Sequence, residues 1–190
     1  MADAKRQRRE RGPDTSPPLS NPSMSKALFG KYVLITGGTS GLGAEIARCA
    51  VNAAAAGVVI TGREAERGAA VVAALTPNSA RQQILAFKQA DLANPEECAA
   101  VFEFAKSKMG YVDCLVNCAA ICFPRGSLTG DDAVDDWAAE LRTLIETNVV
   151  SAMGCIKEAV ADMSTARGGG GGSIVSVSSG SAMIGSPLLY

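Results

Sequence analysis

The sequence predicts a doubly wound α/β fold, in which a parallel sheet carries helices on both faces. Short apolar runs rich in β-branched residues recur along the chain, and each of the first four is followed by a segment with helical periodicity. Such runs are typical of strands buried on both faces, and their alternation with helices requires right-handed crossovers between parallel strands. The predicted strands are residues 32–36 (YVLIT), 57–61 (GVVIT), 84–90 (ILAFKQA), 112–120 (VDCLVNCAA) and 173–179 (SIVSVSS).

Capping residues delimit the helices. Asn94 as N-cap, Pro95 in the first turn and two following glutamates predict a helix from about 95 to 109, closed by Gly110. A second, long amphipathic helix that continues toward Met163 is predicted by apolar residues at intervals of three and four. This stripe, which we expect to face the core or another subunit, consists of Val134, Trp137, Leu141, Leu144, Ile145 and Val149. Five glycines at 168–172 predict a flexible loop before the last strand.

Composition excludes several classes of function. The 190 residues are 47% hydrophobic and 19% charged, with a net charge of -1, so the chain as a whole has no positive field to attract nucleic acid or a membrane. The absence of histidine removes histidine-based triads and most catalytic zinc sites. The six cysteines form no CxxC pair, and we expect them to be small buried apolar residues rather than metal ligands.

The first 25 residues differ from the rest. They contain five basic residues followed by prolines and serines, without apolar periodicity, which predicts a disordered tail before a domain at 26–190. A nuclear address or a nucleic-acid contact is the alternative to a solvated tail. The tail has acidic residues and no apolar core of a signal peptide, and no apolar run in the chain approaches the length of a membrane span, so we expect a cytoplasmic protein. Met24 offers a second natural start.

A glycine-rich turn, TGGTSGLG at residues 36–43, lies between the first strand and a helix that begins near Ser40. Gly37, Gly41 and Gly43 allow the backbone to approach a pyrophosphate, while the helix N-terminus offers unpaired N–H groups and the positive end of a dipole. A tight structural turn is the alternative explanation for the glycines.

The TGxxxGxG spacing resembles the cofactor turn of the short-chain dehydrogenase/reductase family. The resemblance covers residues 28–190 and implies a Rossmann-type domain in which Asp91 and Leu92 contact the adenine. Asn117-Cys118-Ala119-Ala120 stands where the family has NNAG, and the methyl group of Ala120 is a modest intrusion near the nicotinamide ribose. The residues implied to bind the dinucleotide are Gly37, Thr39, Ser40, Gly41, Leu42, Gly43, Arg63, Asp91, Leu92, Asn117 and Ala119.

Charge at the end of the second strand selects between the two dinucleotides. An acidic residue there would bind a ribose 2′-hydroxyl and repel a 2′-phosphate. The sequence has Gly62 instead, followed by Arg63, whose guanidinium suits phosphate. We therefore expect NADP(H) rather than NAD(H). In the alternative, Arg63 faces water with Glu64 or Glu66 as a partner.

Carbonyl reduction needs a proton donor, and without histidine a tyrosine is the natural acid once a cation lowers its pKa from about 10. The resemblance implies Tyr190 as general acid/base and Ser179 as a donor to the substrate oxygen, with Ser178 as the fallback because the following loop is short. It also implies Asn148 as part of a proton relay. Each has a structural alternative: a turn cap for Ser179, a backbone contact for Asn148 and a terminal aromatic for Tyr190.

The sequence ends at Tyr190, four residues before the lysine that the resemblance implies. We expect an incomplete domain that lacks the C-terminal strands, an exposed fifth strand, and little activity from this chain alone. For the intact protein we expect an oxidoreductase that interconverts a small-molecule secondary alcohol and a ketone, and that forms homo-oligomers. The alternatives are an inactive nucleotide-binding or interaction module and, last, a nucleic-acid binder that uses residues 5–11.

Overall fold

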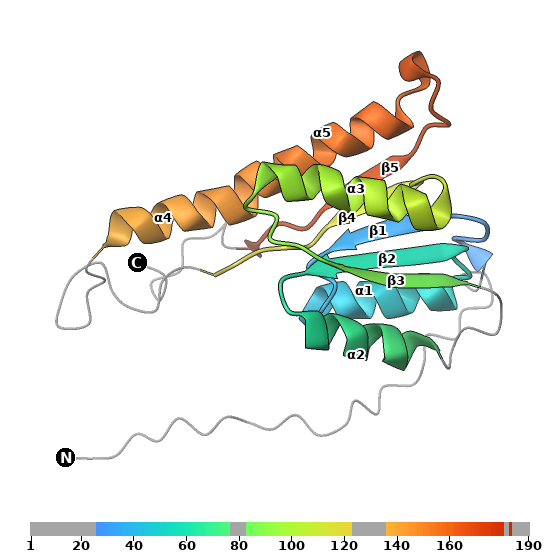
Figure 1. Ribbon diagram of the computed structural model, residues 1–190, viewed down its shortest axis with the longest axis horizontal. Helices are drawn as coiled ribbons and strands as arrows, with labels where there is room; N and C mark the ends of the chain where they lie inside the picture. The colour runs from blue at the N-terminus through green and yellow to red at the C-terminus, as the bar shows by residue number, and fades with distance from the viewer. Residues whose placement is uncertain (1–25, 77–82, 123–135, 181–182, 184–190) are drawn as a thin grey trace.

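A computed structural model describes residues 26–76, 83–122, 136–180 and 183. Its five strands form one parallel sheet in the order β3-β2-β1-β4-β5. Helices α1 and α2 cover one face, and α3 and α5 cover the other (Figure 1). The doubly wound prediction is therefore confirmed. In chain order the elements are β1 (Tyr32–Thr36), α1 (Gly41–Asn52), β2 (Gly57–Gly62), α2 (Ala65–Leu75), β3 (Ile84–Gln89), α3 (Pro95–Met109), β4 (Cys114–Asn117), α4 (Trp137–Ile145), α5 (Ser151–Met163) and β5 (Ser173–Ser176).

The order of the strands reverses at β1, whose two neighbours are β2 and β4. The register places Thr36, the last residue of β1, beside Thr61 of β2 and Asn117 of β4. All the strands are parallel, so their carboxyl ends meet at one edge of the sheet. The connection that follows β1 runs over one face of the sheet, and the connection that follows β3 runs over the other. The place where the strand order reverses is called the switch point, and open sheets of this kind bind ligands in the crevice there.

Two apolar clusters, one on each face of the sheet, form the core. Along β1, Leu34 faces α3 and α5, whereas Val33 and Ile35 face α1 and α2. Leu115 and Val116 of β4 divide in the same way. Successive strand residues point to opposite faces, so a strand covered on both sides needs apolar residues at every position. This explains the continuous apolar runs in the sequence.

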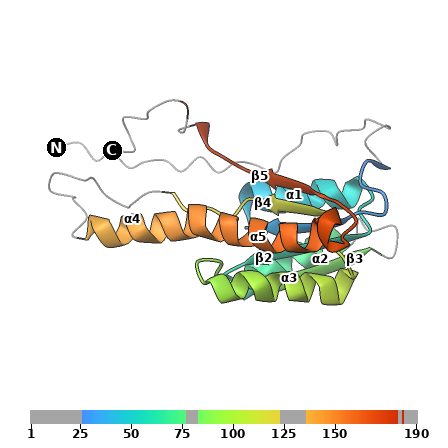
Figure 2. The same cartoon turned by 90° about the horizontal axis from the view of Figure 1, so that it is seen from above.

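The helix boundaries agree closely with the capping residues. The side chain of Asn94 accepts a hydrogen bond from the Glu96 amide at 3.0 Å, and Gly110 ends α3 with φ of 78°. The fourth and fifth strands are shorter than predicted. In the fourth, only the segment Cys114–Asn117 pairs with neighbours, and the amides of the next two residues donate to the side chain of Thr36 instead. The long helix is present, and α4 and α5 follow each other along one helical rod (Figure 2). The residues that join them, Glu146–Val150, form one π-helical turn.

One expectation about burial is narrowed and another needs correction. Of the two partners expected for the apolar stripe on the long helix, the core is excluded among the described residues, since Trp137 is 54% exposed and Val149 is 49% exposed. Contact with another subunit stays a prediction. Cys98 and Cys155 are buried as expected, but Cys49 and Cys122 are exposed. The thiol of Cys49 lies on the solvent side of α1, 3.8 Å from the Glu45 carboxylate. Among the described residues, no helix combines the length and the apolar character needed to cross a membrane.

A buried hydroxyl ties the ends of β1 and β4 together. The amides of Cys118 and Ala119 both donate to Thr36 Oγ1, each at 3.1 Å. Thr61, beside Thr36 in the register, is also buried, but its Oγ1 has no hydrogen-bond partner among the described residues. Two side chains of the same type therefore differ in what their hydroxyl groups do.

We predict that Thr36→Val lowers the free energy of unfolding by about 1–3 kcal/mol, because it leaves two amides without an acceptor. Thr61→Val is the matched control and should be neutral or slightly stabilising, because it removes an unpaired buried hydroxyl. Urea denaturation followed by circular dichroism measures both. Equal losses of stability in the two variants would show that the bonds to Thr36 are unimportant.

Candidate functional site

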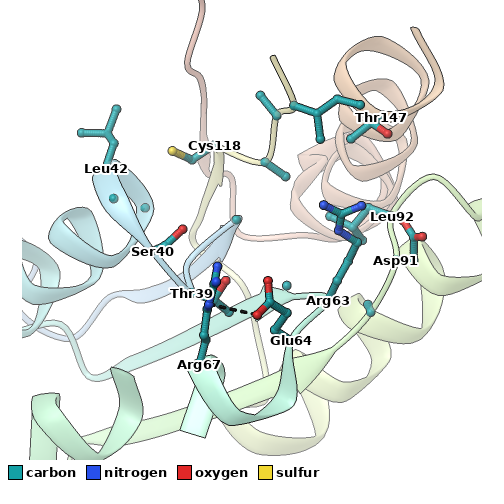
Figure 3. Close-up of a pocket in the computed structure, with 18 residues that line it drawn as sticks. Thr39, Ser40, Leu42, Arg63, Glu64, Arg67, Asp91, Leu92, Cys118 and Thr147 are labelled. Carbon is teal, nitrogen blue, oxygen red and sulfur yellow. Dashed lines mark ion pairs between the residues drawn. The ribbon is translucent and has the colours of Figure 1, made fainter. Parts of the chain in front are cut away.

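A cavity of about 330 Å³ opens at the carboxyl edge of the sheet, around the switch point (Figure 3). Its walls come from the turn after β1, the ends of β2 and β3, the segment after β4 and the π-helical turn. Ten of the eleven residues that the sequence assigned to a dinucleotide line it. They are Gly37, Thr39, Ser40, Gly41, Leu42, Gly43, Arg63, Asp91, Leu92 and Ala119.

The glycine turn is closely packed against the chain that follows β4. Gly37 has φ of 66°, and a Cβ added there would lie 2.7 Å from the Ala119 Cα atom. A Cβ on Gly43 would lie 2.3 Å from the Gly37 carbonyl oxygen. No side chain fits at either position without moving backbone, so these glycines keep the floor of the cavity open to backbone groups.

The first turn of α1 faces this cavity, and neither a capping side chain nor an acidic residue balances its unpaired N–H groups. The N-cap residue, Ser40, makes no side-chain capping bond, and the first turn of α1 has no acidic residue. By contrast, α3 is capped by Asn94 and carries Glu96 and Glu97 in its first turn. Unpaired N–H groups and an uncompensated dipole favour an anion at the start of α1.

The end of β2 contributes the cationic wall. Arg63 projects into the cavity toward Leu92 (Figure 3). Its backbone is held by Gln89 of β3, whose Nε2 donates to the Arg63 carbonyl at 2.9 Å. Gly62 lies against the glycine turn, where an added Cβ would be 2.6 Å from the Thr39 Cγ2 atom. An acidic side chain at position 62 would therefore displace Thr39, which fits the absence of a carboxylate there.

A second arginine, Arg67 of α2, lies in the same wall and was missed by the sequence analysis. Its Nε is 2.9 Å from Oε2 of Glu64, which also lines the cavity. Glu64 pairs with Arg67 and is therefore not the partner of Arg63 that the alternative named. Arg63 is exposed, so the other part of that alternative, in which Arg63 faces water, stays open. Within the described part of the chain, Arg63 makes no ion pair.

The end of β3 supplies a mixed polar and apolar wall. Leu92 is buried, and Asp91 is held by hydrogen bonds of both its backbone amide and its side chain. The Asp91 amide donates to Glu97 Oε2 at 2.8 Å, and its carboxylate accepts from the Ala93 amide at 3.2 Å. This pair of residues places an apolar side chain beside a carboxylate in the cavity wall, and the adenine contact that the resemblance implies stays a prediction.

Asn117 is the assigned residue that the cavity does not include. Its side chain turns under the sheet edge, where Nδ2 lies 3.4 Å from both the Ala152 carbonyl and Ser176 Oγ. The Asn117 Oδ1 atom is buried without a partner among the described residues. In this position Asn117 links β4, α5 and β5, and any contact with a dinucleotide stays a prediction.

Cys118 contributes a thiol to the cavity wall. Burial raises the pKa of this thiol above its usual value, because the thiolate would lose hydration. The neutral thiol therefore predominates at neutral pH, and Cys118 adds no charge to the cavity.

The three assigned catalytic residues are described to different extents. Asn148 lies in the π-helical turn, where Oδ1 accepts from the Ile121 amide at 2.7 Å and Nδ2 donates to the Ile121 carbonyl at 2.8 Å. This is the backbone contact that was its structural alternative. Ser179 is exposed beyond the carboxyl end of β5, and Tyr190 lies outside the described residues. Their proposed roles stay predictions.

Comparison with known proteins identifies the family of the chain. A profile described as short chain dehydrogenase matches residues 31–190. The chain belongs to the short-chain dehydrogenase family. A 3beta-hydroxysteroid dehydrogenase from Mediterraneibacter gnavus is 36% identical over 157 residues, which are 83% of this chain and 52% of that protein. The chain thus spans about half the length of this curated relative.

Solved structures of short-chain dehydrogenases show the same fold. A short-chain type dehydrogenase/reductase from Mycobacterium ulcerans superposes with a TM-score of 0.74 at 31% identity, covering 85% of this chain and 56% of that one. A 7 alpha-hydroxysteroid dehydrogenase, complexed with NADH and 7-oxo glycochenodeoxycholic acid, superposes with a TM-score of 0.72 at 29% identity, covering 86% and 59%. The Rossmann-type domain that the resemblance implied is therefore confirmed.

The cavity also shows what the sequence analysis missed. Arg67 follows Arg63 by four residues and lies in the first turn of α2, so its closeness in the sequence to the end of β2 was an available signal. Gln89 and Thr147 could not be found in this way, since Gln89 acts across a strand pairing and Thr147 reaches the cavity through the π-helical turn.

Close packing at Gly37 generates a stability prediction. Gly37→Ala should lower the free energy of unfolding by about 2–4 kcal/mol, because it adds a backbone clash to the cost of a positive φ. Gly41 also has a positive φ, 51°, but no atom lies within 4 Å of an added Cβ. Gly41→Ala should therefore cost only about 1 kcal/mol. Thermal and chemical unfolding compare the two variants, and an equal cost would disprove the tight contact with Ala119.

Proposed function

We propose that this chain forms the dinucleotide-binding part of an oxidoreductase that interconverts a secondary alcohol and a ketone, with NADP(H) as the preferred cofactor. The observation that carries the proposal is the uncapped, acid-free N-terminus of α1 opening into a cavity whose floor excludes side chains. A diphosphate is the anion that such a backbone cradle accommodates. Family membership supplies the class of reaction, and the hydroxysteroid dehydrogenases among the relatives agree with it.

The residues present fit a dinucleotide along the whole cavity. The turn from Gly37 to Gly43 would hold the diphosphate, and Asp91 with Leu92 would hold the adenine. Ala119 and Ala120 also line the cavity, together with Ile121 and Thr147. When bound, the nicotinamide supplies or accepts the hydride of the reaction.

The preference for NADP(H) rests on charge at the adenosine end. Arg63 projects into the cavity, and its ion-pairing capacity is not used by Glu64. Gly62 offers no carboxylate to a ribose 2′-hydroxyl, and the packing of Thr39 against it resists one. A guanidinium without an acidic neighbour engaging it favours a 2′-phosphate.

Three polar side chains of the chain are proposed to take part in the reaction. Tyr190 donates the proton to the carbonyl oxygen, or removes it from the alcohol, and Ser179 donates a hydrogen bond to the same oxygen. Asn148 holds the backbone of Ile121 and thereby fixes the segment after β4 beside the cavity. Its role as a relay for protons belongs to the same proposal. The exposed apolar stripe that includes Trp137 supports a homo-oligomer for the intact protein.

A nucleotide-binding module without turnover is the second candidate. It shares the cavity, but not the use of Tyr190 and Ser179. Binding of cofactor without reduction of any secondary alcohol or ketone by the intact protein would favour this candidate. Loss of turnover in Tyr190→Phe with cofactor binding retained would favour the enzyme.

Arg63→Asp tests the cofactor preference. We expect NADPH affinity to fall at least about tenfold, because a carboxylate replaces a phosphate ligand, while NADH affinity is kept or improved. Arg167→Asp makes the same change of charge on an exposed residue before β5, at the opposite edge of the sheet, and should leave both affinities within about twofold. Quenching of intrinsic fluorescence or calorimetry measures the affinities. An unchanged preference in Arg63→Asp would refute the role of Arg63, and failure of either cofactor to bind would refute the proposed function.

A further inference from the structure

The cationic wall of the cavity contains a second guanidinium that the family motif does not assign. Arg67 lies in the first turn of α2, on the side of Thr39 and the glycine turn, whereas Arg63 extends on the side of Leu92 (Figure 3). The two arginines approach the end of β2 from different directions. Gly62, which has no side chain, is the last residue of β2 and also lines the cavity.

Arg67 is not free in this arrangement. Its Nε is 2.9 Å from Oε2 of Glu64, and the two side chains are 61% and 58% exposed. Exposed pairs of this spacing on a helix contribute little to stability, because water screens them and two long side chains must be ordered. A doubly charged phosphate at the same wall would compete with a single carboxylate and form stronger hydrogen bonds. The pair is therefore weak enough to be exchanged for a ligand.

The charge balance supports this exchange. Arg63 and Arg67 bring two positive charges to the wall, and Glu64 removes one of them. A 2′-phosphate carries between one and two negative charges near neutral pH. Two guanidinium groups match that charge, whereas Arg63 alone leaves the anion close to the carboxylate of Glu64.

We propose that Arg67 is a second ligand of the 2′-phosphate, and that Glu64 restrains Arg67 until the phosphate takes its place. The inference rests on the proposed function, in which the cavity binds NADP(H). Under this proposal, how strongly the protein prefers NADP(H) depends on how well the phosphate competes with Glu64 for the guanidinium of Arg67.

An ordinary surface ion pair is the competing explanation, and the chain contains a matched example. Glu45 and Arg48 of α1 form an ion pair with the same spacing of three residues, the same residue types and comparable exposure, but neither side chain lines the cavity. If the pair of α2 has only a structural role, variants of the two pairs should behave alike toward a dinucleotide.

The test measures binding of NADPH and of NADH to the wild-type protein and to Arg67→Gln, Glu64→Gln and the double variant. We expect Arg67→Gln to weaken NADPH binding about five- to tenfold and to leave NADH binding within about twofold. Glu64→Gln should tighten NADPH binding about two- to threefold, because it releases Arg67 and removes a negative charge. Most of that gain should disappear when Arg67 is also replaced. Arg48→Gln and Glu45→Gln are the controls, with no change in the ratio of the two affinities.

The outcomes separate this inference from the function on which it rests. If both cofactors bind, Arg63→Asp abolishes the preference for NADPH and Arg67→Gln does not change it, the role of Arg67 is refuted and the proposed function stands. If Glu64→Gln tightens NADPH equally with and without Arg67, Glu64 acts by direct repulsion and its restraint of Arg67 is refuted. If neither dinucleotide binds the wild-type protein, both the function and the inference fail. Thermal unfolding of each variant shows that a change in affinity is not a loss of fold.

Discussion

The structure depends on the close contact between the turn after β1 and the segment after β4. Gly37 packs its backbone against the backbone of Ala119, and the hydroxyl of Thr36 accepts hydrogen bonds from two consecutive amides of that segment. A side chain at position 37 would separate the two strand ends. Because the contact is made by backbone, it can be close only where the chain has no Cβ on one side. The carboxyl edge of the sheet is thus shaped before any ligand is considered.

This contact leaves the amides of α1 as the exposed groups at the edge. The Gly37 carbonyl lies too close to Gly43 for a side chain at position 43, so the backbone of the first turn of α1 itself forms part of the cavity wall. Two other described helices neutralise the same positive end, α3 with Asn94 and two acids in its first turn, and α4 with Asp136 and one acid. The difference between these starts and that of α1 is electrostatic, and it distinguishes an end that stabilises the fold from an end that is available to an anion.

Regular elements of this fold could be predicted from the sequence because they follow from local rules. β1 has the predicted bounds, and α3 begins and ends at the expected cap, proline and glycine. What could not be predicted depends on contacts between distant residues. Asn117 follows a strand that leads to the cavity, yet its side chain turns toward Ala152 and Ser176, which are adjacent only after folding. The order of the strands decides this, and the sequence pattern does not contain that order.

The long helix shows the same limit and its physical reason. Its apolar residues have a helical period from Trp137 to Val149, which predicts one continuous α-helix. The π-helical turn at Glu146–Val150 inserts an extra residue into one turn, so the residues on either side no longer share a single face. Thr147 and Asn148 are adjacent in this turn, and one lines the cavity while the other bonds both backbone groups of Ile121. On the C-terminal side of the turn, α5 packs against the sheet through Cys155 and Ala159. A hydrophobic period reports the average repeat of a helix, so it could predict the helix but not the position of the extra residue where the helix joins the wall of the cavity.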